Sequence, residues 1–356
     1  MLASVIIPTR GRPEILARSV AALATQSLLR GDYEILIGLD GPDPASEIAA
    51  RSAWPHDPGL LTIDYAAQSG QASVRNRLIP RARGRVLVFL NDDVVAERTL
   101  IESHATDAAH SASASPSIVL GSTPWRVFKP DSLFRRLVRA SSMVFFYHRM
   151  DEHVARGGNA DHDWGFRHAW LLNLSIRADL VRAVGGMSVF PSTYGFEDDE
   201  LAWRLRERFA ARVLYRPGAR GLHDHRLTPD EYLRREYRLG YAAWGFAHQA
   251  PRCAADLFRR DITAQGEIDY AREFVFRESK SMEQLHGTLR SWDSMPAEAV
   301  LGSWSKELLH ALYQQHLPLK RWCWRAGLLD AATRSTGAGD VVEAILGRGT
   351  EPAVVV

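Results

Sequence analysis

The chain has 356 residues, and its 44 basic and 42 acidic side chains leave a formal charge of +2 with 46% hydrophobic residues. This hydrophobic content excludes a disordered scaffold, and the near balance of charge excludes a dedicated nucleic-acid binder. The length predicts two or three domains, because domains cluster near roughly 100 to 200 residues.

Cysteine usage and hydropathy predict a cytoplasmic protein. Cys253 and Cys323 are too few for a disulfide framework and are not spaced as metal ligands, so we expect both to be reduced. The first residues lack the pattern of a secretory signal. The longest later apolar run, residues 143–147, falls far short of the roughly 20 residues that a membrane span requires.

Strand-like and helix-like patterns alternate along the first part of the chain. Predicted strands and helices cover residues 4–8, 13–24, 33–39, 45–52, 61–66, 72–82 and 85–90 in that order. This alternation predicts the α/β class, with a mostly parallel sheet and helices on both faces. In such sheets ligands bind beyond the carboxyl ends of the strands, so we expect sites at residues 8–12, 40–41, 69–70 and 91–93.

The later part of the chain changes from mixed to helical pattern. A basic amphipathic piece at 133–139 precedes strand pattern at 169–176, helices at 178–184 and 197–208, and short strands at 212–215 and 220–225. Thr228 followed by Pro229 is a helix start, and helical periodicity then continues to residue 332. We therefore expect an α/β domain over residues 1–226, a helical region over 227–332 and a weakly ordered tail over 333–356.

The first candidate site is Asn91-Asp92-Asp93, at the end of a predicted buried strand. Two adjacent carboxylates there offer oxygen ligands to a divalent cation, and such a cation binds a diphosphate. Taken alone, the pair is better explained as an acidic turn that caps the next helix.

The second candidate site is a run of four acids, residues 197–200, at the start of a predicted amphipathic helix. The helix dipole favours first-turn carboxylates, so one or two would need no functional explanation. Four in succession indicate a functional site in which one carboxylate serves as general base for a hydroxyl.

The third candidate site is His223-Asp224-His225. In a strand the two imidazoles share one face, so either is able to reach a metal ion. A pair of solvated histidines near a strand end explains the motif equally well.

Taken in order, these motifs resemble glycosyltransferase family 2, whose members are inverting glycosyltransferases of the GT-A fold. The resemblance extends from Ser4 to about His225 and covers no motif beyond. The matching motifs are Val5-Ile6-Ile7-Pro8-Thr9, strand 35–41, Ser73-Val74-Arg75-Asn76, Asn91-Asp92-Asp93, Asn173-x-Ser175-x-Arg177, Val184-Gly185-Gly186, Glu197-Asp198-Asp199-x-Leu201 and Pro217-x-Ala219 with His223.

The resemblance implies a GT-A fold, Rossmann-like with a mostly parallel sheet, followed by an α-helical C-terminal region. It implies transfer of a sugar from a nucleotide-sugar, by default a UDP-sugar, with inversion and with Mn²⁺ or Mg²⁺. Asp198 is then the candidate base, while Glu197 and Asp199 are alternatives that instead orient sugar hydroxyls. The other implied residues are Pro8, Thr9, Arg10, Asp40, Arg75 and Asp92 for the nucleotide, Asp93 and His223 for the metal, and Trp170, Asn173 and Asp199 for the donor or acceptor sugar.

Two positions depart from the family pattern. Asp40 stands alone before Gly41 where the family has a second aspartate, and Asn91 replaces the first aspartate of the Asp-x-Asp signature. The second change assigns the cation to Asp93, with Asp92 as helper.

The acceptor and the partners stay open at this point. The acceptor is a hydroxyl of a glycan, a lipid-linked glycan or a small molecule. Segments 133–139 and 320–325 mix basic and aromatic residues that suit an anionic inner membrane face, although a solvated helix face is the better explanation of each. The helical region completes the acceptor site, forms a homodimer or binds another partner.

Two rival functions remain. A nucleotidyltransferase also uses an α/β sheet with acidic metal ligands, but it needs a phosphate-cradling glycine-rich loop that the turn at 8–13 supplies only loosely. A catalytically degenerate GT-A module for sugar binding or assembly is favoured by Asn91. Asp93, Asp198 and His223 together argue against it.

Overall fold

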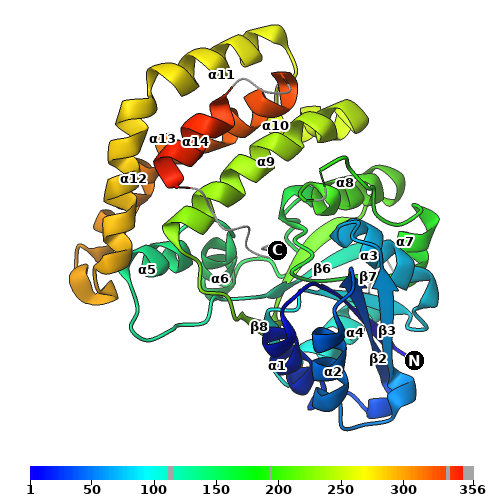
Figure 1. Cartoon of the computed structure of the whole chain (residues 1–356). Coiled ribbons are helices and arrows are strands. Elements are labelled where there is room, and N and C mark those ends of the chain that lie inside the picture. The colour runs from blue at the N-terminus through cyan, green and yellow to red at the C-terminus, as the bar shows by residue number, and fades with distance from the viewer. Residues whose placement is uncertain (111–115, 193, 334–336, 348–356) are drawn as a thin grey trace.

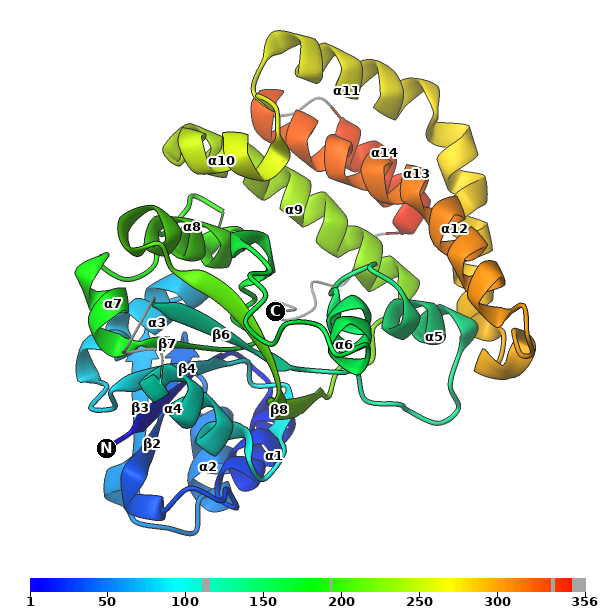
Figure 2. The same cartoon turned by 180° about the vertical axis from the view of Figure 1, so that it is seen from behind.

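Figure 1 shows the computed structural model of the chain, which describes residues 1–110, 116–192, 194–333 and 337–347. An α/β part, coloured blue to green, lies beside a layer of helices coloured yellow to red, and the view from behind shows the same two layers (Figure 2). Helix α9 (Pro229–Gln249) lies on the side of the helical layer that faces the sheet in both views, and α12 (Ser279–Ser294) packs against α5 (Leu133–Ala140) of the α/β part.

A mixed sheet forms the centre of the α/β part, and within the described residues its strand order is β3-β2-β1-β4-β7-β6-β8-β5. The first four strands in that order are parallel, as predicted, whereas β7 is antiparallel to both β4 and β6. The α/β class is therefore confirmed, with a sheet that is mixed rather than parallel throughout. The strands are β1 (Ala3–Thr9), β2 (Tyr33–Asp40), β3 (Leu61–Ala66), β4 (Val86–Leu90), β5 (Val94–Ala96), β6 (Ser117–Ser122), β7 (Asn173–Arg177) and β8 (Arg212–His223).

Strands β1, β2 and β4 are buried along their whole length because helices cover the sheet. Both faces of such strands are apolar, which is why the sequence shows continuous β-branched runs here instead of alternation. Helix α3 packs on β1 and β2, and α4 packs on β4, β6, β7 and β8. The helices of this part are α1 (Pro13–Leu23), α2 (Pro44–Ala53), α3 (Gln71–Leu78), α4 (Leu100–His110), α5 (Leu133–Ala140), α6 (Tyr147–Ala155), α7 (Ala178–Ala183) and α8 (Glu197–Phe209).

The two short strands predicted at 212–215 and 220–225 form one strand, β8. Its parallel pairing with β6 shifts register after Arg216, where Ser122 pairs with Arg220 instead of the next residue. The break that the sequence predicted therefore corresponds to a register shift in the pairing of β8 with β6, and β8 continues beyond it as one strand.

The helical layer is held together by close backbone packing between α9 and α13. A Cβ atom on Gly240 would lie 1.8 Å from the carbonyl oxygen of Trp324, and one on Gly327 would lie 2.0 Å from that of Tyr237. Only glycine fits at these two crossings. The helices of the layer are α9 (Pro229–Gln249), α10 (Pro251–Phe258), α11 (Gln265–Arg277), α12 (Ser279–Ser294), α13 (Ser305–Thr333) and α14 (Ala338–Leu346).

Helix α14 lies inside the segment 333–356, for which the sequence predicted a weakly ordered tail. Ala338, Val342 and Leu346 recur every four residues and are buried on one face of the helix, which packs against α13. Part of that segment is therefore an ordered helix.

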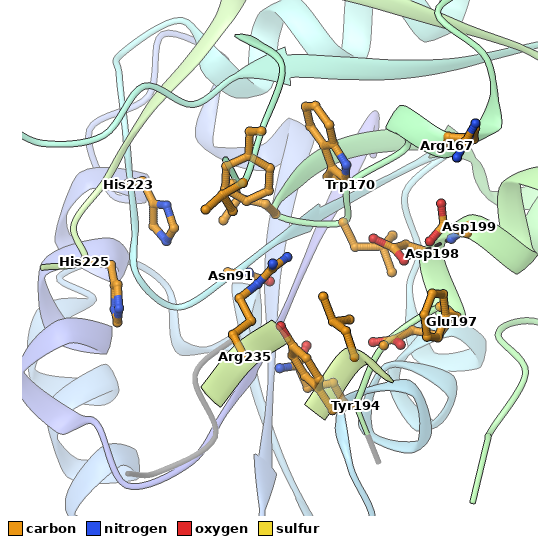
Figure 3. A pocket seen from close by; sticks show the side chains of 18 of the residues that line it. Asn91, Arg167, Trp170, Tyr194, Glu197, Asp198, Asp199, His223, His225 and Arg235 are labelled. Atoms are coloured by element: carbon orange, nitrogen blue, oxygen red, sulfur yellow. Dashed lines mark hydrogen bonds between the residues drawn. The ribbon is translucent and has the colours of Figure 1, made fainter. Parts of the chain in front are cut away.

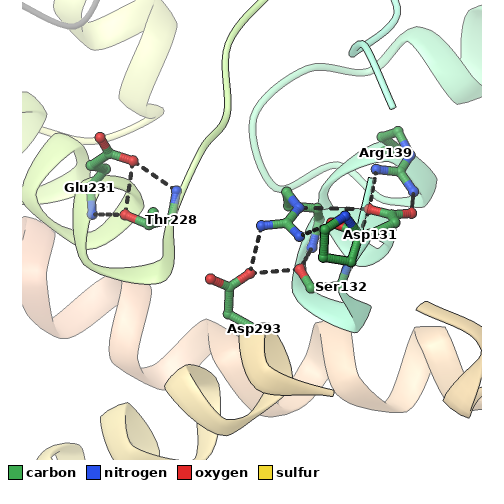
Figure 4. A network of polar contacts seen from close by, with 8 residues as sticks. Asp131, Ser132, Arg139, Thr228, Glu231 and Asp293 are labelled. Atoms are coloured by element: carbon green, nitrogen blue, oxygen red, sulfur yellow. Dashed lines mark hydrogen bonds and ion pairs between the residues drawn. The ribbon is translucent and has the colours of Figure 1, made fainter. Parts of the chain in front are cut away.

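The basic stripe of α5 is occupied by contacts within the chain (Figure 4). A guanidinium nitrogen of Arg135 lies 3.2 Å from Asp293 of α12, Arg139 forms an ion pair with Asp131, and Arg136 donates to the carbonyl of Ala297 at 2.9 Å. Arg135 and Arg136 join α5 to the helical layer, and Arg139 joins it to the segment that precedes it. This differs from both a solvated face and a membrane-binding face. Among the described residues, the structure contains no helix long and apolar enough to cross a bilayer.

Candidate functional site

The carboxyl ends of the neighbouring strands β1 and β4 bring Thr9, Arg12 and Asp92 together. The Thr9 hydroxyl donates to Asp92 Oδ2 at 2.6 Å, and Arg12 Nε donates to the same oxygen at 3.1 Å. Burial raises the pKa of Asp92 to about 6, although Arg12 opposes the shift. Asp92 therefore anchors the turn that follows β4.

Asp93 faces His223, the last residue of β8, and His225, two residues beyond the strand. The antiparallel pair β5–β8 places Val94 opposite His223, so His223 Nε2 lies 3.5 Å and His225 Nδ1 lies 4.0 Å from Asp93 Oδ2. Burial alone would raise the pKa of Asp93, but His223 and then Arg12 outweigh it and hold this pKa below its usual range. Asp93 and His223, which the sequence predicted as metal ligands, therefore lie close together in space.

The donor atoms around Asp93 are of the type that Mn²⁺ and Mg²⁺ accept. Asp93 Oδ1, both ring nitrogens of His223 and Nε2 of His225 are buried and have no hydrogen-bond partner among the residues that the structure describes. The described residues hold no group of three His, Cys, Asp or Glu arranged to bind a metal ion by themselves. The residues thus fit a cation that takes its remaining ligands from phosphate oxygens and water, as Mg²⁺ commonly does.

A pocket of about 210 Å³ opens beside these groups, between the α/β part and α9 (Figure 3). Its walls come from the ends of α3, β4 and β8, the first turn of α8, the segment 125–172 and helix α9. The polar and aromatic residues that line it are Gln71, Arg75, Asn91, Trp125, Phe145, Arg167, Trp170, Tyr194, Glu197, Asp198, Asp199, His223, His225 and Arg235.

Three of the four acids that begin α8 line this pocket, namely Glu197, Asp198 and Asp199. Burial raises the pKa of all three, and in Glu197 burial and then the neighbouring Asp198 raise it to about 7. Three adjacent, partly buried carboxyls do not all ionise together, so their titrations are coupled and they share protons. The fourth acid, Glu200, instead pairs with Arg204 at 2.6 Å on the same helix.

Arg75 connects the end of β4 to this acidic turn. Its side chain is buried, donates to Asn91 Oδ1 at 3.0 Å, and lies 4.0 Å from Glu197 Oε1. Within the described part of the chain, Arg75 Nε has no hydrogen-bond partner. Asn91, at the family's aspartate position, thus accepts a hydrogen bond from Arg75.

Some of the remaining predicted residues line the pocket, whereas others make contacts that hold the fold together. Trp170 lines the pocket as expected, but Asn173 is fully buried, and its amide contacts His104 at 2.8 Å and the carbonyl of Ala219 at 2.9 Å. We correct the prediction for Asn173, because its polar atoms are used to join β7 to α4 and β8. Asp40 accepts from the backbone N–H of Ser69 at 2.7 Å and so shapes the turn before α3.

The other nucleotide predictions are less closely tied to the pocket. Pro8 and Thr9 are buried at the end of β1, and Arg10 follows them at the surface, half-buried. Pro8, Thr9, Arg10, Asp40 and Asp92 do not line the pocket of about 210 Å³. Their contact with a nucleotide stays a prediction.

Sequence reasoning missed Phe145, Arg167, Tyr194 and Arg235, all of which line the pocket. Phe145 belongs to the run 143–147 that appeared in the sequence only as a short apolar stretch. Arg235 lies within a helix of regular period, among other arginines, so nothing in its local sequence distinguishes it. These residues become neighbours only when α9 packs over the acidic turn.

Comparison with known proteins gives a consistent result. Residues 4–172 match the family model "Glycosyl transferase family 2". Two curated relatives, the validoxylamine A glucosyltransferases of Streptomyces hygroscopicus subsp. jinggangensis (strain 5008) and subsp. limoneus, are each 29% identical over 227 residues, 57% of this chain. The match covers 51% and 48% of those proteins, so the chain spans about half the length of the curated relatives it matches.

A solved structure shares the fold. The mannosyltransferase PcManGT from Pyrobaculum calidifontis, solved in complex with GDP-Man and Mn²⁺, superposes with a TM-score of 0.52 and is 16% identical. The superposition covers 93% of this chain and 86% of PcManGT, so it includes the helical layer as well as the sheet.

Proposed function

Because residues 4–172 belong to glycosyl transferase family 2, we propose that the chain is a glycosyltransferase that moves a sugar from a nucleotide-sugar to an acceptor hydroxyl with inversion. The observation that supports this most is the acidic turn of α8. Glu197, Asp198 and Asp199 line the same pocket as Trp170, and Arg75 links that turn to the end of β4.

In this proposal Asp198 accepts the proton of the acceptor hydroxyl while the oxygen attacks the anomeric carbon from the face opposite the leaving group. A base with a pKa raised toward neutral pH removes a hydroxyl proton more effectively than an ordinary carboxylate. Asp199, whose pKa burial raises well above its usual value, orients a sugar hydroxyl by hydrogen bonding. Glu197, held near Arg75, orients the acceptor or donor.

The leaving nucleoside diphosphate carries developing negative charge that must be stabilised. Asp93 and His223 would hold Mn²⁺ or Mg²⁺, which stabilises charge on the departing phosphate. Arg12 joins Asp92 and Asp93 through its guanidinium and keeps both carboxylates at the end of β4. Arg75 and Arg235 add fixed positive charge in the pocket, which is effective because the site is partly buried.

For the substrates, we propose a UDP-sugar as donor and a small polyhydroxylated molecule as acceptor. The curated relatives are named as glucosyltransferases of validoxylamine A, which supports a small acceptor. The arginines of α5 are engaged within the chain, so they do not support a lipid-linked acceptor. A cytoplasmic location, contact with the inner membrane face and a homodimer through the helical region stay predictions.

Incubation of the protein with UDP-, GDP- and dTDP-sugars, Mn²⁺ and a panel of polyol acceptors tests the function. We expect release of one nucleoside diphosphate that depends on the acceptor, and a product whose anomeric proton shows inversion by NMR. Diphosphate formation from a nucleoside triphosphate and a sugar phosphate would instead support a nucleotidyltransferase. Sugar-nucleotide binding without release under any acceptor would support a degenerate binding module, which Asn91 favours.

A further inference from the structure

The residue that precedes the acidic turn has an unusual backbone. Phe196, the N-cap of α8, has φ 71° and ψ −4° and makes no side-chain cap hydrogen bond. This left-handed region is disfavoured for a residue with a large side chain, and an N-cap normally has extended backbone. Such a conformation persists only where surrounding groups hold it, and it is commonly found next to functional groups.

Phe196 is itself part of the pocket wall and is almost wholly buried. It lines the pocket together with the carboxyls that follow it, Glu197 to Asp199, and only 8% of the residue is exposed. The backbone conformation of Phe196 therefore determines where the first turn of α8 presents its acids.

The ring of Phe196 packs against aromatic rings of the helical layer. It stacks on Phe246 of α9 with centroids 4.7 Å apart and planes 12° apart, and it meets Phe258 of α10 edge-on at 5.7 Å. Phe190 meets Phe246 edge-on at 5.3 Å, and Phe246 is fully buried. Aromatic pairs in these arrangements are favourable beyond the area that they bury.

Helix α9 also lies close to the turn itself. Leu239 and Arg235 of α9 line the pocket, and a Cβ atom on Gly195 would lie 3.1 Å from Leu239 Cδ2. Gly195 has φ 97°, so two consecutive residues with positive φ both lie against α9. The helical layer is therefore placed to control the shape of residues 195 and 196.

We propose that Phe246 is a positioning residue, whose ring holds Phe196 in its left-handed conformation and so directs Glu197, Asp198 and Asp199 into the pocket. The helical layer then determines the geometry of the acidic turn without contacting substrate through Phe246. The consequence for catalysis rests on the proposed glycosyltransferase function, whereas the conformational part does not.

Two substitutions of Phe196 separate backbone from packing. Phe196→Gly and Phe196→Ala both remove the ring, but glycine adopts the left-handed region without penalty. We expect amide hydrogen exchange at residues 198–200 to be slower in Phe196→Gly than in Phe196→Ala, and the glycine variant to retain the higher kcat. If Phe196 only fills space, Phe196→Ala should show exchange as slow as Phe196→Gly or slower, and a kcat as high or higher, because glycine costs more backbone entropy. That order would overturn the proposal.

Substitution of Phe246 tests the source of the restraint. Phe246→Ala should speed exchange at residues 198–200 and lower kcat about tenfold or more, with UDP affinity unchanged. Phe274→Ala is the matched control, because Phe274 also stacks on an aromatic ring of the helical layer, Tyr270 at 6.0 Å and 8°, and does not line the pocket. Equal effects of Phe246→Ala and Phe274→Ala on exchange at 198–200 would contradict a specific role for Phe246.

A double variant completes the test. Combining Phe246→Ala with Phe196→Gly should change exchange at residues 198–200 and kcat little beyond Phe196→Gly alone, because glycine does not need a ring to hold its conformation. Full additivity of the two effects would contradict the proposal. If the wild-type protein transfers no sugar, the proposed function fails, and the exchange measurements still decide whether Phe246 holds the turn.

Discussion

The neighbouring acidic residues of the run 197–200 have different environments in this site. Glu200 is neutralised by Arg204, Asp199 is buried among carboxyls, and Glu197 lies near Arg75. The sequence predicted that the run 197–200 is functional, and the pocket contains three of its four members. Their different roles depend on burial and on partners distant in sequence, which the local pattern does not contain.

Replacing Asp198 with asparagine tests the proposed base. We expect Asp198→Asn to lower kcat by about a hundredfold or more, as is typical for a lost general base, because the amide does not accept the hydroxyl proton. Titration with UDP should show nearly unchanged affinity. Asp269→Asn, an exposed position in α11, is the control, and wild-type turnover in Asp198→Asn would exclude Asp198 from the role.

The pH dependence of transfer follows from the raised pKa values. Burial raises the pKa of the proposed base, Asp198, and the base acts only when deprotonated, so the acid limb of kcat/KM should lie above the ordinary range of an aspartate. The neighbouring Glu197, whose pKa burial and then Asp198 raise to about 7, titrates in the same turn. Glu197→Gln removes one of the groups that share protons, and the acid limb should move to lower pH. The same profile measured for Glu207→Gln, further along α8, should match wild type. An acid limb unmoved by Glu197→Gln would contradict proton sharing in this turn.

The cation site is tested by binding instead of turnover. Asp93→Asn removes a negative ligand, so Mn²⁺ should no longer strengthen UDP binding in calorimetry, whereas removal of Mn²⁺ by EDTA should weaken UDP binding to wild type only. Asp64→Asn, whose carboxylate pairs with Arg77 and Arg81 at the surface, should behave as wild type. Equal Mn²⁺ dependence in Asp93→Asn would place the cation elsewhere.

At the scale of elements, the local sequence predicted where a helix starts better than it predicted what the surface of a helix contacts. The predicted N-cap Thr228 forms a full capping box with Glu231 (Figure 4). The basic stripe of α5, by contrast, suggested a solvated or membrane-facing helix, but its arginines contact Asp131, Asp293 and Ala297. A cap involves residues three apart, whereas the partners of α5 include residues about 160 positions away.

The capping box gives a prediction for stability. Thr228→Ala should lower the free energy of unfolding by about 1 kcal/mol, because the N-terminal N–H groups of α9 lose an acceptor. Thr288→Ala is the control, since that hydroxyl bonds to a carbonyl of its own exposed helix turn. Denaturant unfolding of both variants measures the difference, and equal loss in the two would show that the cap contributes nothing specific.

At the scale of the whole molecule, the pocket depends on the contact between the α/β part and the helical layer. Arg235 and Leu239 of α9 form part of its wall, and Phe246 buries the ring of Phe196. The resemblance detected by sequence ends near His225, before Arg235, Leu239 and Phe246. The part of the chain without a recognised motif therefore completes the site.

Removal of the helical layer tests this dependence. A fragment of residues 1–226 should transfer no sugar and should aggregate, because Phe190 and Phe196 lose their apolar cover. Residues 227–356 supplied by co-expression should restore solubility and activity. A soluble fragment 1–226 with wild-type kcat would show that α9 is dispensable.

The sequence by itself determined the class of fold and the positions of the acidic and histidine motifs. These features depend on short-range pattern, namely strand and helix period, strand-end turns and helix caps. Only the tertiary structure decided that Asn173 is structural, that the α5 arginines are internal partners, and that Arg235 enters the pocket. The physical reason is that burial, charge pairing and pocket walls are created by segments far apart in the chain, here by the packing of α9 over the first turn of α8.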